Sequence, residues 1–307
     1  MLDTINPQEW NYIGSGSANV VLGYIGNNED LKGMVVRLRL SKSHISTKEI
    51  YDYLNSAQFN ELKRYIPKMT IHKVGSHGIL SFQSILDDIG MKLSIKPTDE
   101  YVLLMRNIFQ FPIQDYQRIE LNKYYKFFFH KTNKEIVFEL KPKWLYNLPE
   151  GYKTCRNCII AQSKGQSFII CHLKLLGNEN TLSQWCEEIN NELKKRGLEL
   201  DLKEKLQESL LVNHDLFKRI ASIQNRINIH ERLESLNSET DVNDELCFAM
   251  TIRDLSILIK LNTGETYIVD LDKKSSKKWR SWKEQELKIK DQYLKDLDFN
   301  CRFETNT

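Results

Sequence analysis

The order of strand-like and helix-like segments limits this chain to few folds. Short apolar runs separated by turn residues fill the first forty positions, and residues 101–105 and 122–141 continue the β-like pattern. Residues 181–196 and 200–235 have helical spacing, and residues 250–271 return to β around the hairpin turn Asn262-Thr263-Gly264. Strands that come first and a mixed half that follows are typical of the α+β class. The sequence therefore predicts an α+β protein with two lobes, residues 1–106 and 107–307.

The same pattern predicts individual elements. Strands are expected at 11–13, 20–25, 33–40, 168–176, 250–261 and 266–271, and two more within 122–141 on either side of a turn at 131–134. Helices are expected at 47–64, 181–196, 200–235 and 278–296, with a polar loop at 237–244.

Composition narrows the class of protein. The chain has 307 residues, of which 41% are hydrophobic and 28% charged, as in ordinary globular proteins with a sizeable core. The first ten residues lack the basic-then-apolar pattern of a secretory signal, and no apolar run approaches the ~20 residues of a membrane span. A membrane is therefore not an expected partner.

Positive charge is local rather than global. The net charge is only +3, yet residues 273–290 hold eight Lys or Arg against Glu284 and Glu286. Trp279 and Trp282 lie among these cations, a combination that also suits single-stranded nucleic acid. Two interpretations stay open for this stretch: a helix with a solvated cationic face, or a nucleic-acid-binding module.

The six cysteines do not suggest a metal site by spacing alone. They are Cys155, Cys158, Cys171, Cys186, Cys247 and Cys301, and without a secretory signal they are expected to be reduced. A structural zinc ion needs four ligands, and only one C-x-x-C pair, Cys155 and Cys158, is present. Cys171-His172 is a candidate completing pair, but it lies on an apolar run that reads as a strand. Neither a zinc site nor a redox site is predicted here.

The most specific motif is Glu139-Leu140-Lys141-Pro142-Lys143-Trp144-Leu145, which follows a β-like run. The proline fixes its own φ and keeps Lys141 extended, so two ammonium groups are presented close together on a stiff segment. Like charges repel, so the pair makes most sense around a dense anion such as phosphate. The alternative is a solvated turn with two surface lysines.

An early loop and the strand after it also suit a phosphate group. Gly14-Ser15-Gly16-Ser17-Ala18-Asn19 lies between two strands, and small residues let backbone N–H groups approach phosphate oxygens. It resembles the glycine loop of a kinase hairpin, although a plain hairpin has the same pattern. Arg37 lies about where protein kinases place their phosphate-contacting lysine, and arginine can bind phosphate in a bidentate manner.

Two aspartates flank the last predicted hairpin. Asp254 precedes one of its strands and Asp270 follows the other, in the sequence Asp270-Leu271-Asp272. Phosphoryl transfer needs one carboxylate that orients or deprotonates the attacking hydroxyl and another that holds Mg²⁺. Two acidic residues at the rim of an ordinary hairpin are the alternative.

Taken in order, these segments resemble the inositol-pentakisphosphate 2-kinase family, and its fungal branch in particular. The resemblance reaches from about Trp10 to about Trp282 and rests on 14–21, Arg37, 139–143, 155–158, 251–256 and 270–272. It implies a two-lobed, distantly protein-kinase-like α+β fold. It also implies transfer of the γ-phosphate of ATP, with Mg²⁺, to the axial 2-hydroxyl of inositol 1,3,4,5,6-pentakisphosphate, which gives the hexakisphosphate.

The resemblance also implies roles for matching positions. Asp254 would be the general base and Asp270 the Mg²⁺ ligand. Lys141, Lys143 and Lys274 would bind inositol phosphates. The ATP-binding residues would be Gly16, Ser17, Ala18, Asn19 and Arg37 for the phosphates, Met105, Arg106 and Asn107 for adenine, Glu139 for the ribose, and Lys174.

Three positions depart from the family pattern. Ser15 replaces the acidic residue that is usual between the glycines, Cys158 stands where some relatives have a lysine, and Lys174 is expected to substitute for an arginine on the nucleotide side. An ATP-binding scaffold without turnover is therefore a further alternative. The resemblance alone implies a location in the nucleus or cytoplasm. The expected protein is a monomer that acts on small molecules rather than nucleic acid.

Overall fold

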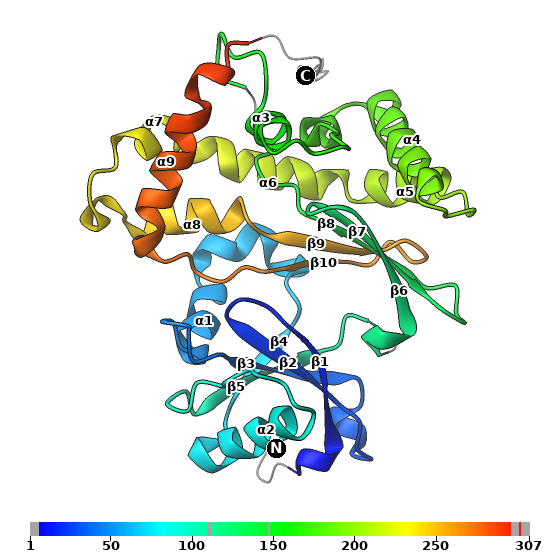
Figure 1. Cartoon of the computed structure of the whole chain (residues 1–307), viewed down its shortest axis with the longest axis vertical. Coiled ribbons are helices and arrows are strands. Elements are labelled where there is room, and N and C mark those ends of the chain that lie inside the picture. Colours follow the sequence, from blue (N-terminus) through cyan, green and yellow to red (C-terminus); the bar gives the residue numbers. More distant parts are fainter. Residues whose placement is uncertain (1–5, 110–111, 147, 296–300, 302–307) are drawn as a thin grey trace. The chain divides into compact units, whose positions relative to one another are not determined.

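The structure is a computed structural model that describes residues 6–109, 112–146, 148–295 and 301 (Figure 1). The chain divides into two compact units, Met1–Tyr116 and Gln117–Thr307. The described residues form two five-stranded antiparallel sheets, and helices accompany both of them. The protein is therefore of the α+β class, as the sequence predicts.

The first unit is built on a sheet with the strand order β1-β2-β3-β5-β4. Helix α2 packs against β1, and helix α1 packs against β4 and β5. Reciprocal hydrogen bonds between Ser46 and Glu49 form a capping box that starts α1. The elements are β1 (Trp10–Ser15), β2 (Asn19–Tyr24), β3 (Met34–Arg39), α1 (Thr47–Leu54), β4 (Met69–Lys73), α2 (Gly75–Asp88) and β5 (Tyr101–Arg106), with short 3-10 turns at Pro7–Glu9, Glu29–Leu31, Ala57–Tyr65 and Ile113–Asp115.

Alternation along β3 decides what each face of the first sheet carries. Val36 and Leu38 are fully buried in one hydrophobic cluster with Phe82 of α2. Successive side chains of a strand point to opposite faces, so Arg37 and Arg39 lie on the face away from this cluster.

The second unit carries a sheet with the strand order β10-β9-β8-β7-β6. Helices α4 and α5 pack against each other, α6 contacts α8, and both α3 and α7 contact α9 (Figure 1). The strands are β6 (Tyr116–Asn122), β7 (Tyr125–His130), β8 (Ile136–Leu140), β9 (Ser256–Lys260) and β10 (Thr266–Val269). The helices are α3 (Arg156–Ser163), α4 (Glu179–Lys195), α5 (Lys203–Val212), α6 (His214–Arg226), α7 (His230–Ser235), α8 (Asp244–Ile252) and α9 (Trp279–Ile289), with 3-10 turns at His172–Leu176, Glu239–Asp241, Ser276–Lys278 and Lys290–Gln292. No helix in the described part of the chain is long and apolar enough to cross a membrane.

Most predicted strands are confirmed, but two predictions are wrong. Residues 168–176 form no strand: irregular backbone leads into the 3-10 turn His172–Leu176, whose Leu173 and Leu175 are buried. Residues 250–252 belong to helix α8, which starts at the Asn243 cap, and only Ser256–Lys260 is extended. Both stretches are buried and apolar, and periodicity alone cannot separate a buried helical turn from a buried strand.

Helix boundaries differ as well. The helix expected at 47–64 is α1 followed by the 3-10 turn Ala57–Tyr65, and the helix expected at 200–235 is three helices, α5, α6 and α7. The predicted helix at 278–296 is α9, which ends at Ile289; residue 296 lies outside the described residues. Strands β4 and β6 and helices α2, α3 and α8 were not predicted.

Candidate active site

Three neighbouring strands of the second sheet each have one terminus at the same edge of the sheet, and this brings the predicted site segments together. Leu140 of β8 pairs with Ile257 of β9, and Ser256 of β9 pairs with Val269 of β10. Because the strands are antiparallel, the end of β8, the start of β9 and the end of β10 meet there. Residues 141–143, 253–255 and 270–274 therefore leave the sheet side by side.

Asp254 lies between two lysines at this edge. Its backbone N–H donates to the carbonyl of Thr251, 3.0 Å away, in the turn that joins α8 to β9. The ammonium groups of Lys143 and Lys274 each form an ion pair with one of its carboxylate oxygens. Burial by itself would raise the pKa of Asp254, but these two cations outweigh it and lower the pKa to about 2. Asp254 therefore stays ionised at neutral and mildly acidic pH.

Asp270 occupies a second carboxylate position beside it. Its Oδ2 accepts from Lys141 Nζ at 3.1 Å and from Ser256 Oγ at 2.7 Å. The carboxylate raises the pKa of Lys141 against the opposing effect of burial. More than half of the Asp270 side chain, 57%, remains exposed, so its oxygens are accessible to a ligand.

Two residues of this edge have backbone conformations that are uncommon outside glycine. Lys143 has φ of 55° and Asp270 has φ of 62°, and they are the two non-glycine residues with positive φ in the described part of the chain. Aspartate adopts this conformation more readily than lysine does, and such residues cluster at functional sites. The backbone is thus constrained at two residues that carry predicted ligand contacts.

Two pockets meet at Lys123 and Lys143. One, of about 380 Å³, is bordered by Asp254 and by cations from several segments, and the other, of about 300 Å³, lies next to it. The basic residues of the two pockets are Arg118, Lys123, Lys126, Lys141, Lys143, Arg156, Arg253, Lys274 and Lys278. The predicted ligands Lys141, Lys143 and Lys274 are thereby brought together, and the arrangement can hold a dense, multiply charged anion.

Lys123 is a member of both pockets that the sequence did not single out. It lies in the turn between β6 and β7, so only the tertiary structure distinguishes it from other surface lysines. Burial, together with the neighbouring cations Lys164 and Lys143, lowers its pKa to about 8. A cation with a lowered pKa gains most from a bound anion, because the anion relieves its desolvation and repulsion.

The segment after Pro142 is anchored by buried polar groups. Two guanidinium groups contact the ring of Trp144: Arg156 lies 4.4 Å and Arg253 4.9 Å from the ring centroid. Arg156 also pairs with Glu286 of α9, and Arg253 donates to backbone carbonyls, including that of Gln224 at 2.8 Å. Both arginines border the larger pocket, but these contacts engage them in holding the segment that follows Pro142.

Glu139 and Lys174, the two residues of the second unit that are predicted to contact ATP near its sugar or phosphates, form ion pairs within that unit. Glu139 accepts from Lys126 Nζ at 3.1 Å and lies 3.8 Å from Lys141 Nζ. Lys174, in the 3-10 turn His172–Leu176, donates to Glu188 of α4 at 2.6 Å and borders neither of the two pockets. Their predicted contacts with ATP stay predictions.

In the first unit, the residues of the loop between β1 and β2 lie open to solvent or half-buried. Gly16 N–H donates to the carbonyl of Asn19 at 2.9 Å, and the carbonyl of Ala18 accepts from Leu40 N–H at 3.0 Å, while Ser17 is exposed. A Cβ atom placed on Gly14 or Gly16 would meet nothing within 4 Å, and neither residue has a positive φ. Neither packing nor backbone geometry of the described residues requires glycine there.

The two arginines of β3 differ in their surroundings. Arg39 is buried and donates to Asn19 Oδ1 at 2.6 Å and to the carbonyl of Ile45 at 3.1 Å, so it orders the end of the loop. Arg37, on the same face, is half-buried and pairs through its backbone with Val21 and Leu103. Arg37 thus lies on the strand next to the loop, and its predicted phosphate contact stays a prediction.

The predicted adenine-binding segment lies at the end of β5, the strand between β3 and β4. Met105 pairs with Val35 on one side and with Met69 on the other. The N–H of Asn107 donates to the carbonyl of Gly33 at 2.7 Å. This N–H is therefore committed within the unit, and any adenine contact here would use other backbone groups.

Most of the chain is similar in sequence to known proteins. A family profile described as inositol-pentakisphosphate 2-kinase matches residues 12–288. An inositol-pentakisphosphate 2-kinase of Debaryomyces hansenii is 26% identical over 358 residues, covering 94% of this chain and 92% of that protein. A protein of the same name from Saccharomyces cerevisiae is 30% identical over 168 residues, which cover 52% of this chain and 56% of that protein. Another from Eremothecium gossypii is 25% identical over 281 residues, which cover 88% of this chain and 93% of that protein.

The profile includes both the glycine loop and the sheet edge with Asp254 and Asp270, and the relatives align over most of the chain. The resemblance drawn from the motifs is thereby confirmed. The chain belongs to the inositol-pentakisphosphate 2-kinase family and is a phosphotransferase.

Proposed function

We propose that this chain uses ATP and Mg²⁺ to phosphorylate the axial 2-hydroxyl of inositol 1,3,4,5,6-pentakisphosphate. The observation that carries the proposal is the edge of the second sheet, where two aspartates from neighbouring strand ends are surrounded by cations from several segments. We also propose that the two units correspond to the two lobes of a distantly protein-kinase-like fold.

The basic pockets suit a substrate with five phosphates. Lys143 and Lys274 bring positive charge to Asp254, and Lys123 and Lys141 extend it into the second pocket. The basic residues of the two pockets come from different segments, so phosphates at different ring positions would meet different residues. A substrate lacking one phosphate would leave cations without a partner, which is a strong basis for discrimination.

Asp254 would orient the attacking hydroxyl and accept its proton. A carboxylate whose pKa is about 2 is a weak base, so it would take the proton late, as expected for the loose transition state of phosphoryl transfer. Substrate phosphates would compete for Lys143 and Lys274. Partial release from these lysines would raise the basicity of Asp254 when substrate is bound.

The donor set at the sheet edge fits Mg²⁺. This ion prefers hard oxygen ligands, usually one or two protein carboxylates completed by phosphates and water. Asp270 offers an exposed carboxylate, and Lys141 beside it could neutralise a phosphate oxygen. Asp270 would hold the ion, which when bound would supply charge neutralisation to the nucleotide phosphates, and Lys141 would balance the surplus negative charge.

The nucleotide phosphates would bind to the first unit. Gly14 and Gly16 are not required by the packing of that unit, so their lack of a side chain is best explained by close approach of a ligand. Arg37 of the neighbouring β3 would supply a bidentate cation, and Asn19, held by Arg39, would fix the end of the loop. Ser17 and Ala18 would contribute backbone N–H groups, and the Arg106 region would meet adenine.

The decisive experiment measures transfer of labelled phosphate from Mg-ATP to a panel of inositol phosphates. We expect conversion of the pentakisphosphate with a free 2-hydroxyl and loss of this conversion in Asp270→Asn. Transfer to another position, or undiminished transfer in Asp270→Asn, would overturn the assignment. ATP binding without any product would favour a scaffold without turnover, and salt-sensitive binding of RNA would favour the nucleic-acid interpretation of residues 273–290.

For the remaining properties we propose a monomer that acts on small molecules in the nucleus or cytoplasm. Within residues 273–290, ion pairs of the second unit engage part of the charge: Lys273 pairs with Asp244, Lys274 with Asp254 and Lys290 with Glu234. These pairs support a role in folding and substrate binding over one in binding nucleic acid.

A further inference from the structure

The buried side chain of Gln224 on α6 links two segments of the candidate active site. Its Oε1 accepts from the N–H of Leu145 at 2.6 Å, and its Nε2 donates to the carbonyl of Lys143 at 2.8 Å. Nε2 also donates to the carbonyl of Ile252, 3.4 Å away and two residues before Asp254. The side chain is fully buried. A single amide thus bonds to the backbone on both sides of the ion pair between Lys143 and Asp254.

The segment that Gln224 holds has an unfavourable backbone conformation. Lys143 has φ of 55°, in the left-handed region that disfavours residues with a Cβ atom. Residues 142–145 belong to none of the described helices or strands and are largely buried, so their backbone groups need partners from other elements. A strained conformation of this kind persists only where its surroundings hold it. Gln224 does so by bonding to the carbonyl of Lys143 and to the N–H of Leu145.

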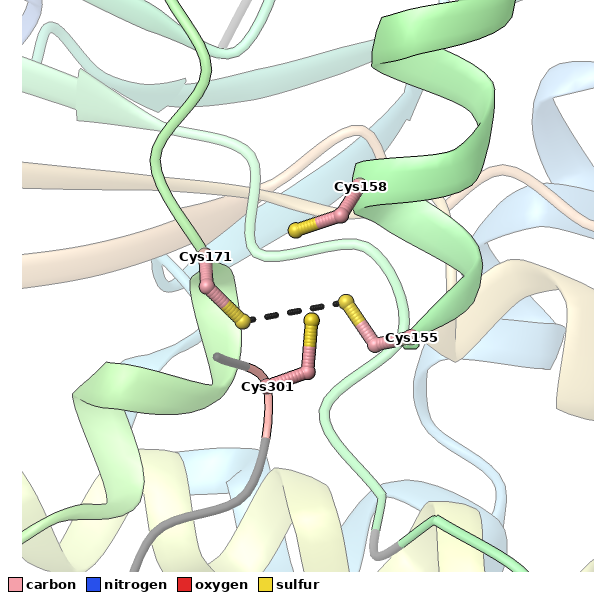
Figure 2. A group of neighbouring side chains, drawn as sticks. All are labelled: Cys155, Cys158, Cys171 and Cys301. Atoms are coloured by element: carbon pink, nitrogen blue, oxygen red, sulfur yellow. Dashed lines mark hydrogen bonds between the residues drawn. The ribbon is translucent and has the colours of Figure 1, made fainter. Parts of the chain in front are cut away.

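Two other side chains hold the same segment from other elements. His172 donates from Nδ1 to the carbonyl of Pro142 at 2.7 Å, and Asn157 donates to the carbonyl of Trp144 at 3.1 Å. Asn157 lies on α3, whose start packs in a cluster of buried cysteines, Cys155, Cys158, Cys171 and Cys301 (Figure 2). The three consecutive carbonyls of residues 142–144 are thus bonded to three different side chains. Of these three, Gln224 also contacts the segment that leads to Asp254.

The main chain of Gln224 strengthens this link. Its carbonyl accepts from Arg253 Nη2 at 2.8 Å, and the carbonyl of Ile227, just after α6, accepts from the same nitrogen at 2.9 Å. Arg253 is the residue before Asp254 and is itself buried. Helix α6 therefore holds the backbone of Lys143 through the amide of Gln224, and it holds the residue before Asp254 through a guanidinium group.

We propose that Gln224 is a positioning residue for Lys143 in the binding of inositol phosphates. The inference rests on the proposed function, in which Lys143 binds a phosphate group of the substrate. Without the amide, Lys143 could relax to an ordinary φ. The altered direction of its Cα–Cβ bond would then displace the ammonium group from Asp254 and from the pocket. Gln224 lines neither of the two pockets, so it acts through Lys143.

A purely structural role for Gln224 is the alternative. Buried backbone groups need hydrogen bonds in any protein, and Gln83 of α2 meets this need in the first unit. Its Oε1 accepts from the N–H of Ile95 at 2.8 Å, and its Nε2 donates to the carbonyl of Leu93 at 2.9 Å. The two interpretations differ in one respect. A positioning residue affects ligand binding only while the side chain that it positions is present, whereas a structural residue has the same effect without that side chain.

The test combines Gln224→Met, which keeps the length of the side chain but removes its hydrogen bonds, with Lys143→Ala. Calorimetry measures the Kd for the pentakisphosphate in the wild type, in both single variants and in the double variant. We expect Gln224→Met to raise this Kd about tenfold when Lys143 is present and less than about twofold in the Lys143→Ala background. The Kd for ATP should stay within about twofold of the wild type. Gln83→Met is the matched control and should leave the Kd for the pentakisphosphate unchanged in both backgrounds.

Gln224→Asn, which shortens the amide by one methylene, provides the same comparison if Gln224→Met does not fold. An unchanged Kd in a folded Gln224 variant would overturn the positioning role, and so would an equal rise with and without the side chain of Lys143. Calorimetry needs no turnover, so its result is separate from that of the transfer experiment. Wild-type protein that binds the substrate with this coupling but transfers no phosphate would overturn the proposed function and still support the role of Gln224.

Discussion

At the residue scale, the side chain of Asp254 is fixed by ion pairs and still accessible to a ligand. Two lysines keep it ionised and fix its position, yet 45% of the side chain remains exposed toward the pocket. A carboxylate in an ordinary surface ion pair has one cation beside it rather than two. The strong lowering of its pKa is therefore a consequence of its place between Lys143 and Lys274.

Replacement of this carboxylate should separate catalysis from folding. Asp254→Asn keeps the shape of the side chain but cannot accept a proton, so we expect kcat to fall by about 10²- to 10⁴-fold. The far-UV circular dichroism spectrum should stay unchanged. Asp215→Asn, which removes an exposed carboxylate paired with Arg219, is the control and should keep full activity. Near-normal kcat in a folded Asp254→Asn protein would remove Asp254 from the role of base.

Lys123 predicts a pH dependence of substrate binding. Its pKa of about 8 means that the free protein loses this charge as the pH rises through 8, whereas the substrate phosphates are already ionised. The KM for the pentakisphosphate should therefore rise between pH 7 and pH 9, by on the order of tenfold if one charge-assisted hydrogen bond is lost.

The matched variant for this prediction is Lys123→Arg. Arginine stays charged throughout this range, so the variant should bind the substrate with a nearly constant KM from pH 7 to pH 9. An equal rise of KM in the wild type and in Lys123→Arg would show that another group titrates.

At the scale of elements, the loop between β1 and β2 is a case where the fold does not explain the residue type. Asn19 and the backbone of Gly16 close the loop, but Gly14 and Gly16 have ordinary φ values and open space around them. Another residue could stand at either position without strain. Function rather than folding is therefore the stronger reason for glycine there.

We predict that Gly16→Val weakens ATP binding without loss of stability. The free energy of unfolding should change by no more than about 0.5 kcal/mol, because a surface position with space tolerates a side chain. The KM for ATP should rise more than about tenfold, since the side chain would occupy the place of a phosphate, while the KM for the inositol phosphate stays the same. Kinetics with each substrate varied in turn measure both constants.

Gly90→Val in the same unit should behave in the opposite way. Gly90 has φ of +70°, a conformation that a β-branched residue adopts only with strain, so this variant should lose stability and keep its KM for ATP. An unchanged KM for ATP in Gly16→Val would place the nucleotide phosphates away from this loop.

The sequence was least informative about elements that are buried and short. Residues 168–176 have the apolar content of a strand, but Cys171 precedes and His172 begins a 3-10 turn. Their side chains contact Cys155 and the carbonyl of Pro142. Long periodic segments such as α4 were predicted well, because an exposed face and a buried face alternate over several turns.

At the scale of the whole molecule, positive charge is concentrated by folding rather than by composition. A chain with a net charge of +3 forms two adjoining pockets that carry most of their charge as lysine and arginine. The field of such a concave basic surface attracts a polyanion and should make its capture sensitive to salt.

We therefore expect the KM for the pentakisphosphate to rise several-fold between about 0.05 and 0.3 M NaCl, because the Debye length shortens to well below 10 Å. Lys143→Ala should bind more weakly at low salt and show a shallower salt dependence. Sucrose at matched osmolality is the control and should leave KM unchanged. A salt dependence as steep in Lys143→Ala as in the wild type would mean that Lys143 contributes no charge to binding.

The class of fold, most strands of both sheets, and the motifs with Lys141, Lys143, Asp254 and Asp270 could be predicted from the sequence alone. This was possible because strand periodicity and a proline-fixed segment are local properties. The folded structure was needed to show that Lys123 borders both pockets, that Arg156 and Arg253 contact Trp144, and that Cys301 lies beside three earlier cysteines. These contacts join residues far apart in the chain. They depend on packing and on the burial of charge, and neither can be predicted from a local sequence pattern.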